Sequence, residues 1–408
     1  MLAAAILCAR FLGKGGFGRF SIVQTTANTL SVLAGLGLSV TATRYVADLR
    51  LSDPERTGRI IGLSWLIALA SGAGLTIGSI ACAPWMARSL LHDPHLTTSL
   101  RIASLLILVN AMLSFQNGAL AGFEAFRSLT SNSLLSGIIS FPLILLGVWR
   151  WGINGALVGT ALSLLVRWAL NEHVLRAVCR NASIVMNISE PWSESGIFWK
   201  FSLPALLASL AIAPVLWICN LMIVRSPHGF QQMALYAGAD RWRVIILFIP
   251  SALFRSALPM LSNLHRENPA GYKRVAQANL WVNMVLVVIP VCLFASFSKV
   301  IMESYGASFR SGWPILVVLC LATIPEALNT ILGYPLVVSG KMWSRFMFDL
   351  LLSAVLLIGS LLLIPVYGAF GFALAYAAAF SVTSVGLLLF TRDRIGLNVM
   401  QSSGDIAC

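Results

Sequence analysis

The residues with the clearest capacity for chemistry are two arginines in one long apolar stretch. Arg241 and Arg255 lie within 235–260, and as a helix this stretch would place them about 40° apart around the axis and about 21 Å apart along it. A guanidinium stays charged and binds phosphate oxygens through its planar fork. The spacing predicts two positive groups on one helix face that could hold a diphosphate. The alternative for Arg255 is that it extends its charge to the polar boundary of the stretch.

A carboxylate also lies well inside an apolar stretch. Glu326 follows Pro325 within 311–332, and a carboxylate in such a place is a candidate for coupling a process to an ion. The alternative is that Glu326 pairs with an arginine. Arg44 stands just beyond the stretch 20–43, where it either marks the end of that stretch or binds a lipid headgroup.

Polar residues recur three or four positions apart within two apolar stretches. Gln24 and Asn28 belong to such a stripe in 20–43, and Asn117 belongs to another in 100–120. Polar groups that face lipid cost free energy, so each stripe is expected to face protein or water. Gln24, Asn28 and Asn117 are therefore candidate substrate contacts. The same stripes could instead hold neighbouring helices together.

Sequence patterns of catalysis and of metal binding are missing. There is no phosphate-binding Gly-Lys-Ser/Thr loop, no nucleophile elbow and no zinc pattern, and the seven cysteines form no C-x-x-C pair. We therefore expect no catalytic residues, no metal and no cofactor. The net charge of +13 fits the lysines and arginines of cytoplasmic loops better than nucleic-acid binding, because no dense basic patch is interleaved with aromatic residues.

The amino-acid composition indicates that the segments carrying these residues lie in a lipid bilayer. The chain is 58% hydrophobic and only 11% charged, whereas soluble domains are about 25% charged. In lipid every backbone polar group must be bonded internally, and long continuous apolar runs favour helices over a barrel. The sequence predicts an all-α membrane protein with about 11 full transmembrane helices. The predicted spans lie near 20–43, 60–83, 100–120, 133–149, 153–170, 199–224, 235–260, 279–298, 311–332, 347–365 and 368–390.

The first nine residues are apolar but too short to cross a bilayer, because a helix of that length covers only about 14 Å. They are interpreted as the end of a truncated first helix. A basic leader and a convincing cleavage site are both lacking, so a signal peptide is not expected.

Short sequence matches recur at nearly constant spacing along the chain. The segment Trp151-Gly-Ile-Asn-Gly resembles Tyr367-Gly-Ala-Phe-Gly, 216 positions later. Two further matches follow the same order, around Phe20 and Tyr236 and around Arg127 and Arg345. They predict two six-helix lobes related by an internal repeat, with a transport site between them. The predicted domains are an N-terminal helical lobe at 1–175, a central cytoplasmic linker at 176–198, a C-terminal helical lobe at 199–392 and a cytoplasmic tail at 393–408.

Basic residues in the loops suggest the orientation. If the loop after 20–43 is cytoplasmic, the two loops densest in lysine and arginine, 44–59 and 255–274, both lie inside. This direction agrees with the positive-inside rule. The loops around 88–101 and 150 then lie outside.

Several segments resemble a known family. Ala9-Arg-Phe-Leu-Gly-Lys-Gly-Gly-Phe-Gly18, then Gly35-Leu-Gly-Leu-Ser and Arg44-Tyr-Val-Ala, resemble the opening of polysaccharide and O-antigen flippases. These belong to the multidrug/oligosaccharidyl-lipid/polysaccharide exporter superfamily. Ala234-Leu-Tyr-Ala-Gly-Ala-Asp-Arg241 and Ile249-Pro-Ser-Ala-Leu253 resemble the opening of that family's second half. The likeness covers essentially the whole chain, which departs from the family by lacking a complete first helix.

The resemblance implies a multi-pass protein of the bacterial inner membrane that works by alternating access. Its substrate would be an oligosaccharide on undecaprenyl diphosphate, flipped to the periplasmic leaflet for the synthesis of O-antigen, lipopolysaccharide or exopolysaccharide. It would not be an enzyme, and a polysaccharide polymerase and glycosyltransferases would be its partners. One alternative is a multidrug/cation antiporter of the same superfamily, which should need more buried carboxylates. Another is a membrane polysaccharide polymerase or ligase, which should need longer outer loops.

Overall fold

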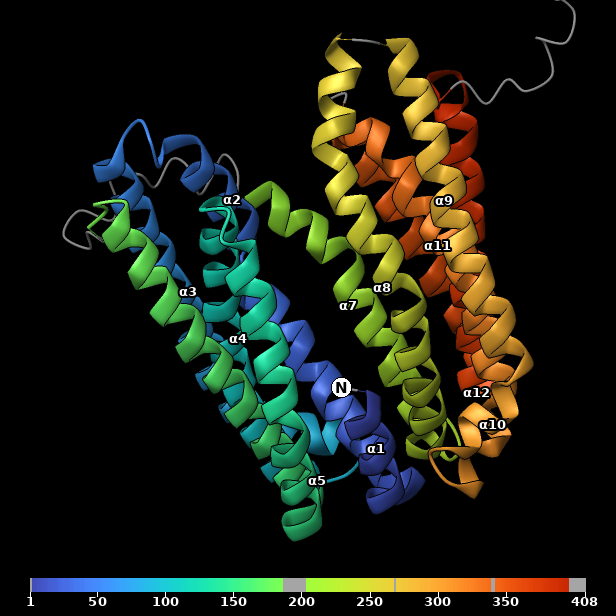
Figure 1. Cartoon of the computed structure of the whole chain (residues 1–408). Coiled ribbons are helices and arrows are strands. Elements are labelled where there is room, and N and C mark those ends of the chain that lie inside the picture. The colour runs from blue at the N-terminus through green and yellow to red at the C-terminus, as the bar shows by residue number, and fades with distance from the viewer. Residues whose placement is uncertain (1, 186–202, 268, 339–341, 396–408) are drawn as a thin grey trace, which may run out of the picture. The chain divides into compact units, whose positions relative to one another are not determined.

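The computed structural model describes residues 2–185, 203–267, 269–338 and 342–395 (Figure 1). Within these ranges the chain is almost entirely helical and contains no strand, which confirms the all-α fold class. The chain divides into two compact units, Met1–Ala234 and Leu235–Cys408. The predicted lobe boundaries stay a prediction. Most of the predicted linker and nearly all of the tail lie outside the described residues.

The first unit contains α1 (Leu2–Ala34), α2 (Leu38–Leu49), α3 (Pro54–Trp85), the π-helical turn η1 (Met86–Leu90), α4 (Leu96–Gly122), α5 (Phe126–Asn181) and α7 (Leu203–Arg225). The helix α8 (Gly229–Glu267) begins at the end of this unit and continues into the second. The second unit also contains α9 (Pro269–Ser296), α10 (Ser298–Glu303), the 3-10 turn η4 (Ala307–Gly312), α11 (Trp313–Val338) and α12 (Met342–Ile395).

Several of these helices are long and apolar enough to cross a bilayer. Among the described residues six pass this test, namely α3 with η1, α4, α5, part of α9, α11 and α12, and the pair α1 and α2, bent by 41°, forms a seventh. At 56 and 54 residues, α5 and α12 would each be more than 80 Å long if straight, against a hydrocarbon core of about 30 Å. Each is broken, so each supplies the two adjacent spans expected from the sequence.

The two breaks have the same backbone geometry. Gly152 in α5 and Gly368 in α12 both have φ 57° and ψ −132°, and they lie 216 positions apart, the spacing of the sequence repeat. Such a conformation is open essentially to glycine alone. The two units therefore share the glycine conformation at the break, whereas the preceding residue is non-helical only in α5, at Trp151. Figure 1 shows α5 descending in one arm and returning in a second.

The arms of each broken helix pack backbone to backbone just beyond the turn. A Cβ atom added to Gly155 would overlap the carbonyl oxygen of Gly147 on the other arm of α5. In α12, a Cβ atom on Gly371 would overlap the carbonyl oxygen of Leu363. Gly155 and Gly371 are again 216 positions apart. Small residues of this kind allow close approach of membrane helices where apolar burial gives no driving force.

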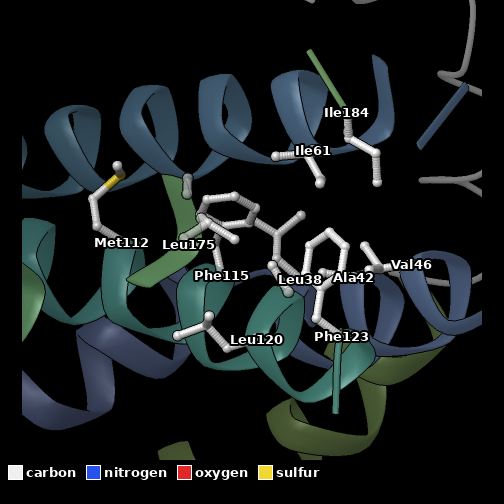
Figure 2. Close-up of a cluster of buried hydrophobic side chains, with 12 residues drawn as sticks. Leu38, Ala42, Val46, Ile61, Met112, Phe115, Leu120, Phe123, Leu175 and Ile184 are labelled. Carbon is white, nitrogen blue, oxygen red and sulfur yellow. The ribbon is translucent and has the colours of Figure 1, made fainter. Parts of the chain in front are cut away.

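A buried apolar cluster holds α2 within the first unit (Figure 2). Leu38 of α2, Phe115 of α4 and Leu175 of α5 are at most 4% exposed and belong to this cluster. Figure 2 shows side chains from α2, α3 and α4 converging on one space, with Phe115 near its middle. The residues Leu36 and Gly37, which have φ 45° and 68°, form the bend before α2. Packing in this cluster fixes the direction that α2 takes after the bend.

Candidate functional site

A partly buried cluster of charges lies in the second unit, where Arg243 of α8 meets Glu326 of α11. One terminal nitrogen of Arg243, Nη1, donates to both carboxylate oxygens of Glu326, at 2.6 and 2.8 Å. Its Nε donates to Asp240 Oδ1 at 2.7 Å. Nη1 also lies 2.9 Å from the hydroxyl of Tyr376 on α12. Three elements thus meet at one guanidinium.

Burial makes this cluster costly to disrupt. The side chains of Arg243 and Glu326 are 15% and 16% exposed, and Tyr376 is buried. The guanidinium carbon of Arg243 lies 5.1 Å from the centre of the Tyr376 ring, which is within the range of a cation–π contact. One cation faces two carboxylates, so the three ionised groups carry a net charge of −1. Membrane interiors tolerate such groups when they pair in this way.

Local sequence explains how the partners reach one another. Asp240 and Arg243 are three positions apart on α8 and therefore lie on one face of it. Pro325 precedes Glu326 within α11, and its carbonyl oxygen accepts a hydrogen bond from Ser384 of α12 at 2.6 Å. This bond fixes α11 to α12 beside the carboxylate. The buried carboxylate that the sequence singled out therefore pairs with an arginine, the second of the two readings given for it.

Two of the three arginines chosen from the sequence, Arg241 and Arg44, are exposed. Arg241 is exposed on α8. Arg255 lies in the same helix, but its side chain is outside the described residues. Arg44 of α2 is exposed and lies 3.8 Å from Asp48, one turn further along. The role of all three as substrate contacts stays a prediction.

The polar stripes of α1 and α4 partly face each other. Asn110 of α4 lies 3.4 Å from the Ser31 hydroxyl of α1, so this part of the stripes joins the two helices. Gln24 is half-buried and Asn28 is exposed. The role of both as substrate contacts stays a prediction.

Asn117 belongs to a chain of amides in the first unit. Its Oδ1 accepts from Asn171 Nδ2 of α5 at 3.2 Å, and Asn171 Oδ1 accepts from Asn132 Nδ2 at 3.0 Å. Asn171 is fully buried. The chain links α4 to both arms of α5, so Asn117 serves packing in this structure. Its predicted contact with substrate remains untested.

Replacing Asn171 with Leu should lower the free energy of unfolding by about 1 kcal/mol, because Asn132 and Asn117 each lose a buried partner. Reversible unfolding of the purified protein in mixed SDS micelles measures this change. Asn28→Leu is the matched control, since Asn28 is exposed and should leave the unfolding free energy unchanged. Equal stability of the two variants would contradict a structural role for the amide chain.

Arg243 is the residue that the sequence reasoning missed. It lies within the apolar stretch 235–260 but was not singled out there, and in the structure it stands well within α8. Two signals pointed to it: the need of Glu326 for a counter-charge, and the spacing of three between Asp240 and Arg243.

The chain is similar in sequence to known membrane proteins over most of its length. The EPS I polysaccharide export inner membrane protein EpsE of Ralstonia nicotianae is 26% identical over 388 residues, covering 92% of this chain and 86% of that protein. The lipid III flippase of Escherichia coli K12 is 21% identical, covering 97% of this chain and 95% of that protein.

Solved structures show the fold. An inward-facing multidrug resistance MATE family transporter of the MOP superfamily matches with a TM-score of 0.79 at 14% identity, covering 97% of this chain and 94% of that one. The lipid II flippase MurJ, in an inward closed conformation, matches with a TM-score of 0.76 at 14% identity, covering 97% and 86%. The chain therefore has the fold of this group of membrane transporters. The family model described as "Polysaccharide biosynthesis protein" matches residues 3–265, more than half of the sequence, and the chain belongs to that family.

Proposed function

We propose that the protein is a flippase of the bacterial inner membrane that moves a lipid-linked oligosaccharide from the cytoplasmic to the periplasmic leaflet for surface polysaccharide synthesis. The observation that carries this proposal is the extent of the likeness. The export protein and the lipid III flippase match over at least 92% of this chain, so the resemblance involves both units. An undecaprenyl diphosphate carrier is the proposed lipid, and a polymerase and glycosyltransferases are the proposed partners.

The charged cluster favours a flippase over a multidrug/cation antiporter. An antiporter site attracts cations to carboxylates that lack a counter-charge. Here the carboxylate of Glu326 already receives two hydrogen bonds from Arg243. Glu326 therefore differs from the carboxylates of such a site, because it already has a cationic partner. Coupling of transport to an ion through Glu326 remains a prediction.

A polymerase or ligase has less support, because the described outer connections are short. Only residues 91–95 separate η1 from α4, and a two-residue break separates the arms of α5. A transporter needs no catalytic group, and we propose that the protein performs no covalent chemistry.

Deletion of the gene should stop surface polysaccharide production and trap lipid-linked oligosaccharide on the cytoplasmic leaflet. The measurement is the amount of lipid-linked sugar that remains inaccessible to a glycan-modifying reagent added outside spheroplasts. Complementation with the wild-type chain should restore export, whereas Arg255→Ala should restore it only in part if Arg255 contacts the diphosphate. Normal surface polysaccharide in the deletion strain would refute the flippase. Full complementation by Arg255→Ala would remove only this residue from the path.

A further inference from the structure

One end of the first unit contains a cavity of about 360 Å³ whose lining is both polar and apolar, with Leu96 and Ile153 among the apolar residues. It lies where α1, the connection between α3 and α4, and the break of α5 meet. Its lining combines charged, amide, hydroxyl and aromatic side chains: Arg19, Asp93, His95, Ser99, Trp151 and Asn154. This volume is at the lower end of the roughly 300–1,000 Å³ typical of small-molecule sites.

The backbone after α3 holds Asp93 at the cavity, where it pairs with Arg19. The π-helical turn η1 ends α3, and the amide of Asp93 then donates to the carbonyl oxygen of Ala87 at 2.9 Å. The Asp93 carboxylate is nearly buried and accepts from Arg19 Nε at 2.7 Å and from the amide of His95 at 3.1 Å. Arg19 also lies over the ring of Phe230, 5.0 Å from its centre. Its guanidinium is thus held in place while 43% of the side chain remains exposed.

The part of the lining that belongs to α5 presents an aromatic side chain and an oriented amide. Trp151 stands at the break before Gly152 and is 67% exposed. Asn154, half-buried in the first turn after the break, accepts a hydrogen bond from the Ser99 hydroxyl at 2.6 Å through its Oδ1. This bond orients the amide group and leaves its Nδ2 hydrogens without a protein partner among the described residues.

The second unit shows that the fold does not require these polar groups. At positions 216 later, Arg19, Ser99 and Asn154 correspond to Leu235, Ile315 and Phe370. Leu235 and Ile315 are buried, so apolar packing occupies the matching places. Only the aromatic residue at the break is retained, as Tyr367. The polar lining of the first unit therefore calls for another explanation, and binding of a polar ligand supplies one.

The chemistry of the lining suits a sugar better than a phosphate. A pyranose ring has an apolar C–H face, which an exposed indole can cover, and a rim of hydroxyl groups. The amide hydrogens of Asn154 and the guanidinium hydrogens of Arg19 are donors to such hydroxyl oxygens. Asp93 compensates the charge of Arg19, which removes the excess of positive charge that a diphosphate would need.

We propose that this cavity is a carbohydrate subsite that holds one or two sugar residues of the transported oligosaccharide. The inference rests on the proposed flippase function. In the orientation predicted from the basic loops the cavity opens on the outer side, so it would receive the sugar as the headgroup leaves the membrane.

The test measures binding of soluble sugar to the full-length protein in lipid nanodiscs. The probe is a mixture of oligosaccharides obtained by partial acid hydrolysis of the producing bacterium's surface polysaccharide. Isothermal titration calorimetry measures its binding. Wild-type protein should bind, and Trp151→Ala should weaken binding about tenfold or more. Trp151→Phe should retain most of the affinity. Trp149→Ala is the matched control, because Trp149 is 69% exposed on the same helix and does not line the cavity.

Equal affinity of the Trp149→Ala and Trp151→Ala variants would overturn the subsite, as would the absence of binding by the wild-type protein. Asn154→Ala is a second variant, which removes a hydrogen-bond donor instead of the aromatic ring, and it should also weaken binding. The deletion strain separates the two proposals. Trapped lipid-linked sugar without binding of the soluble probe would reject the subsite alone, whereas normal surface polysaccharide would reject the flippase.

Discussion

Replacement of Arg243 with Met should lower the free energy of unfolding by about 3–5 kcal/mol, the range for breaking a buried ion pair from one side. The substitution keeps an unbranched stem but removes the guanidinium, so Glu326 loses the two hydrogen bonds it receives. Asp240 loses its partner as well. Reversible unfolding in mixed SDS micelles, followed by circular dichroism, measures the loss.

Glu326→Gln is the matched variant for this experiment. It retains an acceptor oxygen for Arg243 and leaves one cation opposite Asp240, so most of the stability should remain. The double variant Arg243→Met/Glu326→Leu removes both charges and should be more stable than Arg243→Met alone. An Arg243→Met protein as stable as the wild type would mean that the cluster contributes nothing to the second unit.

Replacement of Gly155 with Val should destabilise the first unit by about 3 kcal/mol, the upper part of the usual range for overpacking. The new Cβ would overlap the carbonyl oxygen of Gly147, which is backbone and cannot rotate away. The two arms of α5 would have to separate. The fraction of monodisperse protein that survives heating in detergent, measured by size-exclusion chromatography, reports this effect.

The control for this prediction is Gly137→Val on the first arm of α5, where an added Cβ meets no atom within 4 Å. This variant should behave as the wild type. Gly371→Val should reproduce the loss in the second unit, because the backbone contact there is with Leu363. If Gly155→Val and Gly137→Val survive heating equally, the close contact of the two arms is not required.

The fold was largely accessible from the sequence because lipid imposes a simple rule. Long apolar runs must be helices, and the Trp151-Gly and Tyr367-Gly matches marked the two breaks, where the two glycines have identical backbone angles. The bend before α2 was not foreseen. It depends on the αL conformations of Leu36 and Gly37 and on packing against α4, which hydropathy does not report.

The candidate site was only partly accessible. Glu326 was identified by its place inside an apolar stretch, but its partner was not. Arg241 and Arg243 differ by about 200° around a helix, and the sequence does not show which of the two faces inward. The cavity beside Trp151 was missed entirely. Its groups come from four separate segments, and the contact between Arg19 and Asp93 joins residues 74 positions apart.

The touching backbones of the two helical hairpins also restrict how this transporter can move. Sliding one arm of α5 along the other would bring a residue that carries a Cβ atom to the place of Gly155, where a Cβ atom would overlap the carbonyl oxygen of Gly147, and α12 has the same constraint at Gly371. Shear inside either hairpin is therefore blocked, and each hairpin must travel as a stiff lever. The flexing that accompanies a transport cycle then belongs to joints outside the hairpins, such as the bend between α1 and α2.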